Sequence, residues 1–236
     1  MELWDTTRQA LVLLGTGDPE LWQIVGVSLR VSLSALLLIT APAIAAGFVL
    51  AHVAFPGRRA LVVLVQGLLS LPTVVVGLVL YMLLSRQGPL GDWHLLFTQK
   101  AMILGQMMLA LPVLTAYTVT AVQGADARVF ETAVSLGAGG FRAALSTLWE
   151  VRFGVMAAVF TGFGRIISEI GCSLMVGGNI AGLTRNMPTA IALETSKGQF
   201  AQGVALGIVL LILALGVNVA LAALQGQGGM RKAWQP

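Results

Sequence analysis

The chain has 236 residues, of which 57% are hydrophobic and 10% are charged, whereas soluble domains carry about 25% charged residues. This composition excludes an ordinary soluble protein and predicts an all-α polytopic membrane protein. The formal net charge is +4, but the basic residues are scattered over short loops and form no stripe of the kind that binds nucleic acid. The single cysteine excludes an internal disulfide, and the two histidines lie far apart without carboxylate clusters, so we expect no metal site.

Residues 1–25 carry acidic side chains, and their apolar run at 10–14 is too short for the core of a signal peptide. We therefore expect an external or interfacial segment outside the transmembrane core. Five apolar stretches follow, and each is long enough to cross a bilayer, which takes about 20 residues. The predicted spans are residues 26–51, 60–85, 101–123, 153–176 and 203–224, and residues 225–236 form a tail.

Five spans place the two ends of the chain on opposite sides of the membrane. Cytoplasmic loops of membrane proteins are richer in lysine and arginine than external ones. The loops after the first and third spans and the tail carry Arg58, Arg59, Arg128, Arg142, Arg152, Arg231 and Lys232. We predict that these segments are cytoplasmic and that the N-terminus is external.

Two spans share the pattern Gln-x-x-Leu-x-Leu-Pro, which ends at Pro72 in the second span and at Pro112 in the third. Proline removes a backbone donor and frees a carbonyl, which a membrane helix tolerates only where protein or water covers it. We expect a broken helix near mid-membrane at each proline. Paired broken helices often mark the pathway of a transporter, although prolines that merely kink two packed helices would leave the same pattern.

The segment 124–152 concentrates charge and glycine between two long apolar runs, which predicts a loop in water. Residues 127–136 suit a short helix with one apolar side, and Gly137, Gly139 and Gly140 would end it. The segment contains Glu131-Thr132-Ala133 followed by Leu136-Gly137-Ala138. These motifs are similar to the EAA loop of permease subunits of bacterial ABC importers. The resemblance implies a coupling helix that docks on a separate ATPase subunit; an ordinary cytoplasmic linker helix is the alternative.

The fourth span contains Arg165 and Glu169, which lie four residues apart on one helical face. A charge at this depth costs at least about 2.5–3.5 kcal/mol on insertion scales, and pairing reduces that cost. The two residues form either a structural ion pair at a helix or dimer interface, or part of the route that moves with gating. Direct substrate binding by Arg165 is a third interpretation.

A glycine-rich turn from Gly177 to Arg185 follows this pair. Its backbone N–H groups could face an anion, with Arg185 adding positive charge; a tight external turn is the alternative. The chain contains no Gly-x-x-x-x-Gly-Lys-Ser/Thr motif, so it has no recognisable ATP site of its own. The candidate pathway or gate residues are Pro72, Pro112, Arg165, Glu169, Gly177, Gly178, Asn179, Thr184 and Arg185.

Several motifs in the C-terminal half belong together. They are Gly164-Arg165, Ser168-Glu169-Ile170-Gly171, Met175 to Ile180, Thr184-Arg185 and Thr189 to Gly198, with Leu71 to Leu78 and Gly88 to Gly91 before them. Together they resemble tungstate-type ABC permeases, within the wider molybdate, tungstate and sulfate oxyanion group. The resemblance covers roughly residues 28–224. The chain departs from the family pattern at Thr132, where alanine is common, and at Cys172-Ser173-Leu174.

This resemblance implies the type I importer fold, a homodimer in the bacterial inner membrane, a cytoplasmic ATPase subunit and an external substrate-binding protein. The chain would be a transport subunit rather than an enzyme, would bind no cofactor and would carry an oxyanion, tungstate before molybdate or sulfate. A gradient-driven carrier would instead need coupling carboxylates in the membrane, and Glu169 is the sole candidate. A membrane enzyme would need a cluster of His, Asp, Glu or Cys at one face, which the sequence lacks.

Overall fold

The computed structural model describes residues 3–229, in which all regular structure is helical. The helices in chain order are α1 (Leu3–Thr16), α2 (Pro19–His52), α3 (Arg58–Leu68), α4 (Thr73–Leu84), the 3-10 helix η1 (Gly91–Trp93), α5 (Gln99–Gln123), α6 (Ala127–Ser135), α7 (Gly140–Glu150), α8 (Arg152–Ile167), α9 (Gly171–Gly177), α10 (Met187–Ser196) and α11 (Phe200–Gly229). Within the described residues α2, α5 and α11 are long and apolar enough to cross a membrane, and the number of spans rises to five if the bent pairs α3–α4 and α7–α8 each count as one. The prediction of an all-α membrane protein is confirmed. The basic residues Arg231 and Lys232 of the predicted tail lie outside the described residues.

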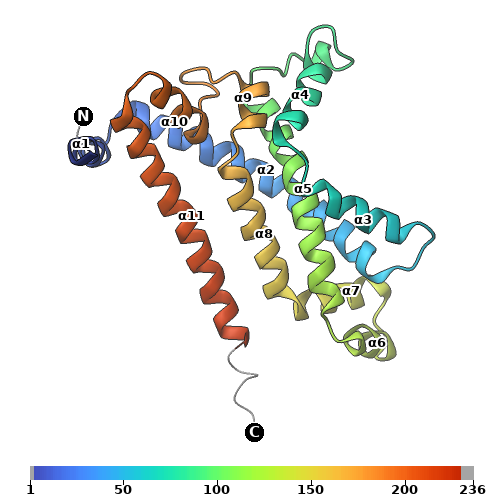
Figure 1. Ribbon diagram of the computed structural model, residues 1–236. Helices are drawn as coiled ribbons and strands as arrows, with labels where there is room; N and C mark the ends of the chain where they lie inside the picture. The colour runs from blue at the N-terminus through green and yellow to red at the C-terminus, as the bar shows by residue number, and fades with distance from the viewer. Residues whose placement is uncertain (1–2, 230–236) are drawn as a thin grey trace.

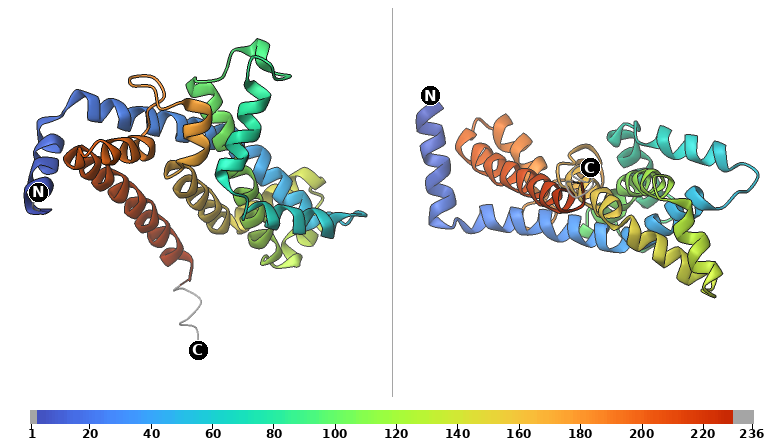
Figure 2. Two further views of the ribbon diagram at one scale, coloured as in Figure 1. Left: turned by 45° about the horizontal axis from the view of Figure 1, so that its top comes forward. Right: turned by 90° about the horizontal axis from the view of Figure 1, so that it is seen from below.

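The long helices run from one end of the molecule to the other. Figure 1 shows α5, α8 and α11 in this direction, with α6 and α7 at the lower end and α9 and α10 at the upper end. α2 crosses behind α8 and α5 at an incline, and α1 lies at the edge of the bundle beside α11 (Figures 1 and 2). α1 therefore lies at the upper end and α11 finishes at the lower end, as an odd number of crossings would give.

The first membrane helix is longer than the sequence predicted. α2 has 34 residues, which gives a length of about 51 Å at 1.5 Å per residue, against a hydrocarbon core of about 30 Å. It begins at Pro19 because the side chain of Asp18 accepts the N–H of Leu21 at 2.9 Å and caps the first turn. Residues 19–25, which we predicted to belong to a separate N-terminal segment, are the first turns of α2.

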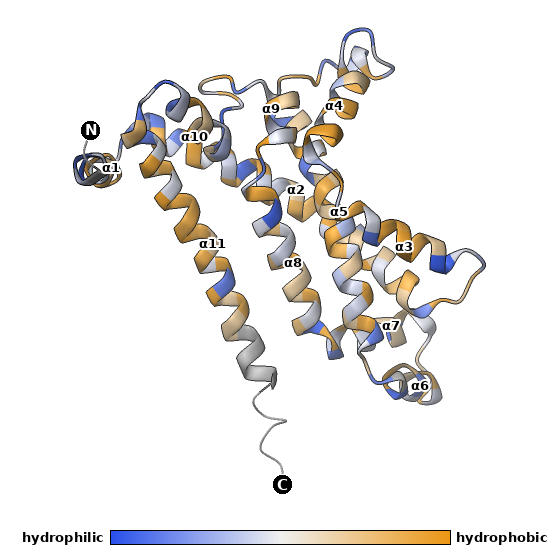
Figure 3. Ribbon diagram, in the orientation of Figure 1, coloured by the Kyte–Doolittle hydropathy of each residue, from blue (hydrophilic) through white to orange (hydrophobic). Residues whose placement is uncertain are grey.

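α5 lies at the centre of the bundle and packs against α2, α8, α4 and α9. Small residues let these helices approach closely. A Cβ added at Gly47 of α2 would lie 2.6 Å from the Cβ of Thr118 in α5, and Gly162 of α8 faces Leu114 of α5 at similarly close range. α11 differs, because it is mostly apolar (Figure 3) but few of its side chains between Phe200 and Ala223 are buried. In a bilayer this surface faces lipid or a partner protein.

The two spans with the shared proline pattern have different structures. α3 ends at Leu68, α4 begins at Thr73 directly after Pro72, and the two helices meet at 101°. Pro112 instead lies inside α5, which continues unbroken through it. The prediction of a broken helix is confirmed at Pro72 and wrong at Pro112. Pro112 is buried among neighbouring helices, so packing holds α5 together despite the missing N–H, whereas Pro72 is exposed.

Candidate functional site

The fourth predicted span, residues 153–176, is not one helix. α8 ends at Ile167 and α9 begins at Gly171, with a non-helical stretch at 168–170 between them. Ser168 and Glu169 interrupt the apolar run of the sequence at this point, although we predicted a continuous span there. The break depends on contacts that the folded chain brings together.

The break before α9 lies beside the break before α4. A Cβ added at Gly171, the first residue of α9, would lie 2.9 Å from Oγ1 of Thr73, the first residue of α4. A Cβ added at Gly77 of α4 would lie 2.8 Å from the Cα of Cys172. Only glycine permits such approaches, so the starts of α4 and α9 pack backbone against backbone. We call residues 69–72 and 168–170 together the paired break.

Arg165 and Glu169 form the predicted ion pair at this place. Nη1 of Arg165 lies 2.8 Å from Oε2 of Glu169; the carboxylate side chain is 3% exposed and the arginine side chain 38%. Oε1 of Glu169 accepts the backbone N–H of Cys172 at 3.1 Å. Glu169 therefore caps the first turn of α9 while it holds a side chain from the last turn of α8, which ties the two helices together across the break.

The paired break presents polar groups to the outside of the chain. Residues 69–72, Ser168 and Ile170 are exposed, and the side chain of Arg165 is only partly covered. Irregular backbone at membrane depth is stable only against protein or in a water-filled cavity. The N–H groups of Leu69, Ser70, Leu71 and Glu169 donate within the chain. The polar groups that this face would present to protein or water at membrane depth are therefore chiefly the side chains of Ser70, Arg165 and Ser168.

Gln106 belongs to this region, although the sequence did not single it out as a site residue. It is 1% exposed, and its Nε2 donates to the carbonyl oxygen of Ile166 in the last turn of α8 at 3.2 Å. Its Oε1 has no hydrogen-bond partner among the residues that the structure describes. Gln106 is the glutamine of the Gln-x-x-Leu-x-Leu-Pro pattern that ends at Pro112. From the sequence we interpreted only the proline of this pattern.

The glycine-rich turn from Gly177 to Arg185 folds onto itself. The hydroxyl of Thr184 donates to the carbonyl of Gly177 at 2.6 Å and accepts the N–H of Ile180 at 3.0 Å. The N–H groups of Thr184 and Arg185 both donate to the carbonyl of Ile180. The N–H groups of Ile180, Thr184 and Arg185 are therefore occupied within the turn, so none of these three is free to face an anion. The alternative, a tight turn, describes this part of the loop.

Two further candidate residues of the turn also have partners within the chain. Nη1 of Arg185 lies 3.3 Å from Oε1 of Glu20 in α2, so an ion pair engages its charge. Nδ2 of Asn179 donates to the carbonyl of Thr189 in α10 at 3.4 Å. Residues 177–185 thus connect α9 to α2 and α10.

The upper end of this region is covered by Phe97. Its N–H donates to the carbonyl of Val176 at 2.9 Å, and a Cβ added at Gly178 would come 2.8 Å from its ring. Gly178 has a φ of +69°, a conformation that other residues rarely adopt. Beside Phe97 is a cavity of about 740 Å³ whose lining includes Arg86 and His94.

The predicted coupling segment folds as the short helix α6 at the lower end of the bundle (Figure 1). Asp126 caps its start with a hydrogen bond from a backbone N–H. At its end Gly137 has a φ of +87°, and the N–H groups of Gly137 and Ala138 donate to the carbonyls of Val134 and Ala133. This is the Schellman arrangement that stops helices. The predicted helix and its stop at Gly137 are confirmed, whereas Gly139 and Gly140 begin α7.

α6 presents part of the family-like motif to the outside of the chain. Glu131, Thr132 and Leu136 are exposed, and the side chain of Leu136 is 83% exposed. Ala133 and Ala138 are partly buried. The motif residues therefore form a capped helix with an accessible outer surface.

Comparisons with known proteins bear on the identity of this membrane protein. No protein-family model matches the chain. The chain is 38% identical over 216 residues to the tungstate uptake system permease protein of Campylobacter jejuni, with 92% of this chain and 90% of that protein covered. It is 41% identical over 200 residues to a probable anion ABC transporter permease protein of Haloferax volcanii, with 83% and 86% covered. It is 35% identical over 218 residues to the tungstate uptake system permease protein of Peptoclostridium acidaminophilum, with 92% and 96% covered.

Molybdenum and sulfate transport system permease proteins of Escherichia coli also match, at 31% and 26% identity. The matches with the three relatives above extend over most of this chain and most of each relative. Permeases of this kind are transport components and not enzymes. The chain therefore belongs to the permease family of ABC transporters, in the oxyanion group that contains the tungstate, molybdenum and sulfate permeases, and is a multi-pass membrane subunit of a transport system.

Proposed function

We propose that this chain is the membrane subunit of an ATP-driven importer that carries tungstate into the cell. Two relatives that are named tungstate uptake permeases match over 92% of the chain, which supports tungstate ahead of molybdate or sulfate. The oxyanion would be delivered by an external binding protein, and ATP would be hydrolysed by separate cytoplasmic subunits. The lack of a phosphate-binding motif in this sequence agrees with that division of labour.

The observation that carries the proposal is the form of α6. It has nine residues, is stopped by Gly137 and projects from the end of the bundle with Glu131 and Leu136 exposed. A helix capped at both ends keeps its shape with little packing of its own. A partner that grips it can therefore move it as a rigid body.

A second copy of the chain would cover the paired break. The exposed side chains of Ser70 and Ser168 and the partly exposed Arg165 are costly against lipid, and a homodimer with this face at its centre would shield them. The Arg165–Glu169 pairs of the two copies would then line a shared route. Arg165 would offer positive charge to a passing anion, while its pairing with Glu169 keeps the affinity low.

The route would open by a rigid-body movement. ATP binding closes the two ATPase subunits, and α6 moves with them. α5 and α8 flank the segment 124–152 and carry the movement to the paired break, which opens the route outward. Substrate affinity would reside mainly in the external binding protein, so weak contacts along the route suffice.

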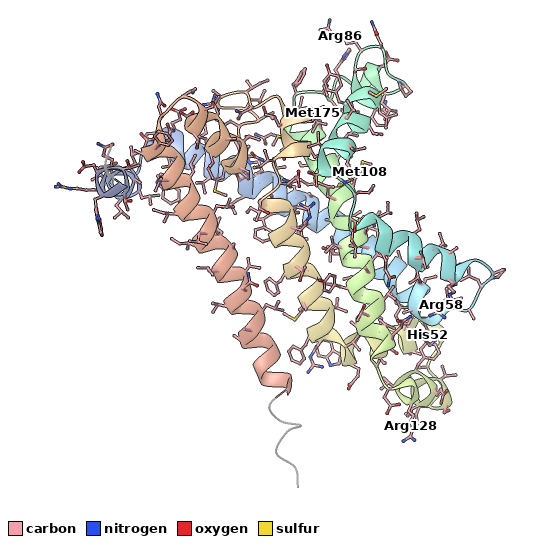
Figure 4. All side chains as sticks on the ribbon, in the orientation of Figure 1. His52, Arg58, Arg86, Met108, Arg128 and Met175 are labelled. Atoms are coloured by element: carbon pink, nitrogen blue, oxygen red, sulfur yellow. The ribbon has the colours of Figure 1, made fainter. Side chains whose placement is uncertain are left out.

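We assign the lower end of the molecule to the cytoplasm. Arg58 and Arg128 both lie at this end (Figure 4), and basic residues favour the cytoplasmic side. The upper end, with Arg86 and the cavity beside Phe97, would then face the external binding protein. The N-terminus would be external and the C-terminus cytoplasmic.

Reconstitution in liposomes tests the proposal. The chain is combined with the ATPase and the binding protein that co-purify with it, and uptake of labelled tungstate is measured with and without ATP, with molybdate and sulfate as competitors. We expect ATP-dependent tungstate uptake that excess sulfate does not suppress. Preferential uptake of molybdate would show that the chain is a molybdate permease of the same group. Uptake by the purified chain alone, without ATP, would overturn the proposal in favour of a gradient-driven carrier centred on Glu169.

A further inference from the structure

An aromatic contact joins α6 to the first membrane helix. The ring of His52, the last residue of α2, lies 4.0 Å from the ring of Phe130 in α6, measured between centroids. The same imidazole stacks on Phe48, one turn earlier in α2, at 5.3 Å. The separation of His52 and Phe48 lies in the range in which ring pairs attract each other, and the rings of His52 and Phe130 are closer still. His52 therefore forms the middle of a three-ring bridge between α2 and α6.

The packing around this bridge is open. A cavity of about 460 Å³ adjoins it, with a lining that includes His52, Phe130, Gln123 and Thr147 from α2, α6, α5 and α7. The backbone of α6 packs chiefly against α7. A movement of α6 relative to α2 would therefore pass through the ring contact rather than through tight helix packing.

The end of α2 is in turn held to the next helix by Arg58. This residue begins α3, and it donates from Nε to the carbonyl of Leu50 at 2.6 Å and from Nη2 to the carbonyl of Ala51 at 2.7 Å. Carbonyls in the last turn of a helix lack helical N–H partners, and a cation suits this negative end of the helix dipole. The turn between α2 and α3 is thus closed by a two-point contact near His52 (Figure 4).

α3 leads from this turn to the paired break. It ends at Leu68 and is followed by the exposed residues 69–72. The start of α4 then packs against Gly171 at the start of α9. A displacement at His52 therefore has a continuous path to the paired break that does not use the covalent links of α6 to α5 and α7.

We propose that His52 is a positioning residue for transport, which transmits the movement of α6 to α2, and that Arg58 passes this movement to α3 and the paired break. The inference rests on the proposed function, because it takes α6 to be the element that the ATPase moves. It adds a second route to the one through α5 and α8. The α3–α4 side and the α8–α9 side of the paired break would then be displaced together.

The test uses the complete transporter in liposomes and measures ATP hydrolysis and tungstate uptake in the same sample. In His52→Ala and Phe130→Ala we expect ATP hydrolysis to continue while the number of anions imported per ATP falls about two- to tenfold, the factor that corresponds to one aromatic pair. In the double variant the number of anions imported per ATP should fall no further than in the more strongly impaired single variant, because both changes remove the same contact. His52→Phe keeps an aromatic ring at this position, so the number of anions imported per ATP should stay close to that of the wild type.

Matched controls separate this role from general damage. Val53→Ala alters the neighbouring position, which is outside the ring bridge, and should leave the ratio unchanged. Arg58→Ala should lower the ratio, whereas Arg59→Ala should not, because Arg59 is exposed and the structure gives it no hydrogen bond to the described residues of α2.

An unchanged ratio in His52→Ala within an intact transporter would overturn the proposal, and so would an equal fall in Val53→Ala. If the alanine variants do not assemble, His52→Phe and His52→Leu decide the matter. A ratio retained with phenylalanine and lost with leucine supports the bridge, and equal ratios overturn it. A wild-type complex that neither hydrolyses ATP nor imports an anion would refute the proposed function itself and this inference with it, a result that the variants cannot mimic.

Discussion

The carboxylate of Glu169 lies 2.8 Å from the guanidinium of Arg165 at the point where α8 stops and α9 is about to begin. The same carboxylate accepts the N–H of Cys172, so one buried side chain holds both helices. This arrangement turns an interruption in a membrane span into a defined bend.

Glu169→Ala should destabilise the protein and impair transport, because it leaves Arg165 unpaired and removes the cap of α9. Breaking a fully buried pair costs about 3–5 kcal/mol, and we expect about 1–3 kcal/mol here because the Arg165 side chain is 38% exposed. Thermal unfolding in detergent measures the change. Glu169→Gln keeps an oxygen acceptor and should lose less, and Arg30→Ala, at an exposed arginine, serves as the control. An unaltered melting temperature in Glu169→Ala would show that the pair has no structural role.

Gly77→Ala should destabilise the contact between α4 and α9. The added Cβ would meet the Cα of Cys172 at 2.8 Å, and backbone cannot yield as a flexible side chain does, so we expect a cost of about 1–3 kcal/mol. Gly67→Ala is the matched control, because a Cβ there meets nothing within 4 Å. Comparison of the two melting temperatures in detergent checks the prediction. Equal values would mean that the two helix starts do not pack as closely as described.

Glu131→Lys or Gly137→Leu should abolish ATP-driven uptake while membrane insertion stays intact. Glu131 is exposed on α6, and Gly137 has a φ of +87° that side chains adopt only with strain. Gly139→Ala is the control, because Gly139 has an ordinary φ of −65° and open space around it. Uptake assays and membrane fractionation measure the two properties separately. Uptake at the wild-type rate in both variants would show that α6 does not couple ATP hydrolysis to transport.

Thr184→Val should loosen the turn between α9 and α10. The buried hydroxyl both donates to the carbonyl of Gly177 and accepts the N–H of Ile180. Leaving these two groups without partners costs about 1–3 kcal/mol each, less any water that enters. Thr184→Ser keeps the hydroxyl and should stay close to wild type. Hydrogen exchange at the backbone of residues 177–185 reports the difference, and equal exchange in both variants would contradict the prediction.

The features that the sequence predicted correctly depend on residues close together in the chain. The membrane class follows from composition, and the ends of α6 follow from Asp126 and from Gly137 at a position that needs positive φ. The pairing of Arg165 with Glu169 follows from the four-residue spacing of a helix. Hydrophobic runs likewise located the long membrane helices, because each must bury about the same thickness of hydrocarbon.

Tertiary structure decided what the local pattern left open. The same proline motif ends in a broken helix at Pro72 and in a continuous one at Pro112, because only Pro112 is buried among other helices. The contact of Gly171 with Thr73 and that of His52 with Phe130 join residues far apart in the sequence. Such contacts depend on how whole helices pack against one another. The local sequence around each residue does not indicate which distant residue it will contact. The sequence by itself therefore determined the class of protein and its family motifs, and the packing of the helices determined which of those residues meet.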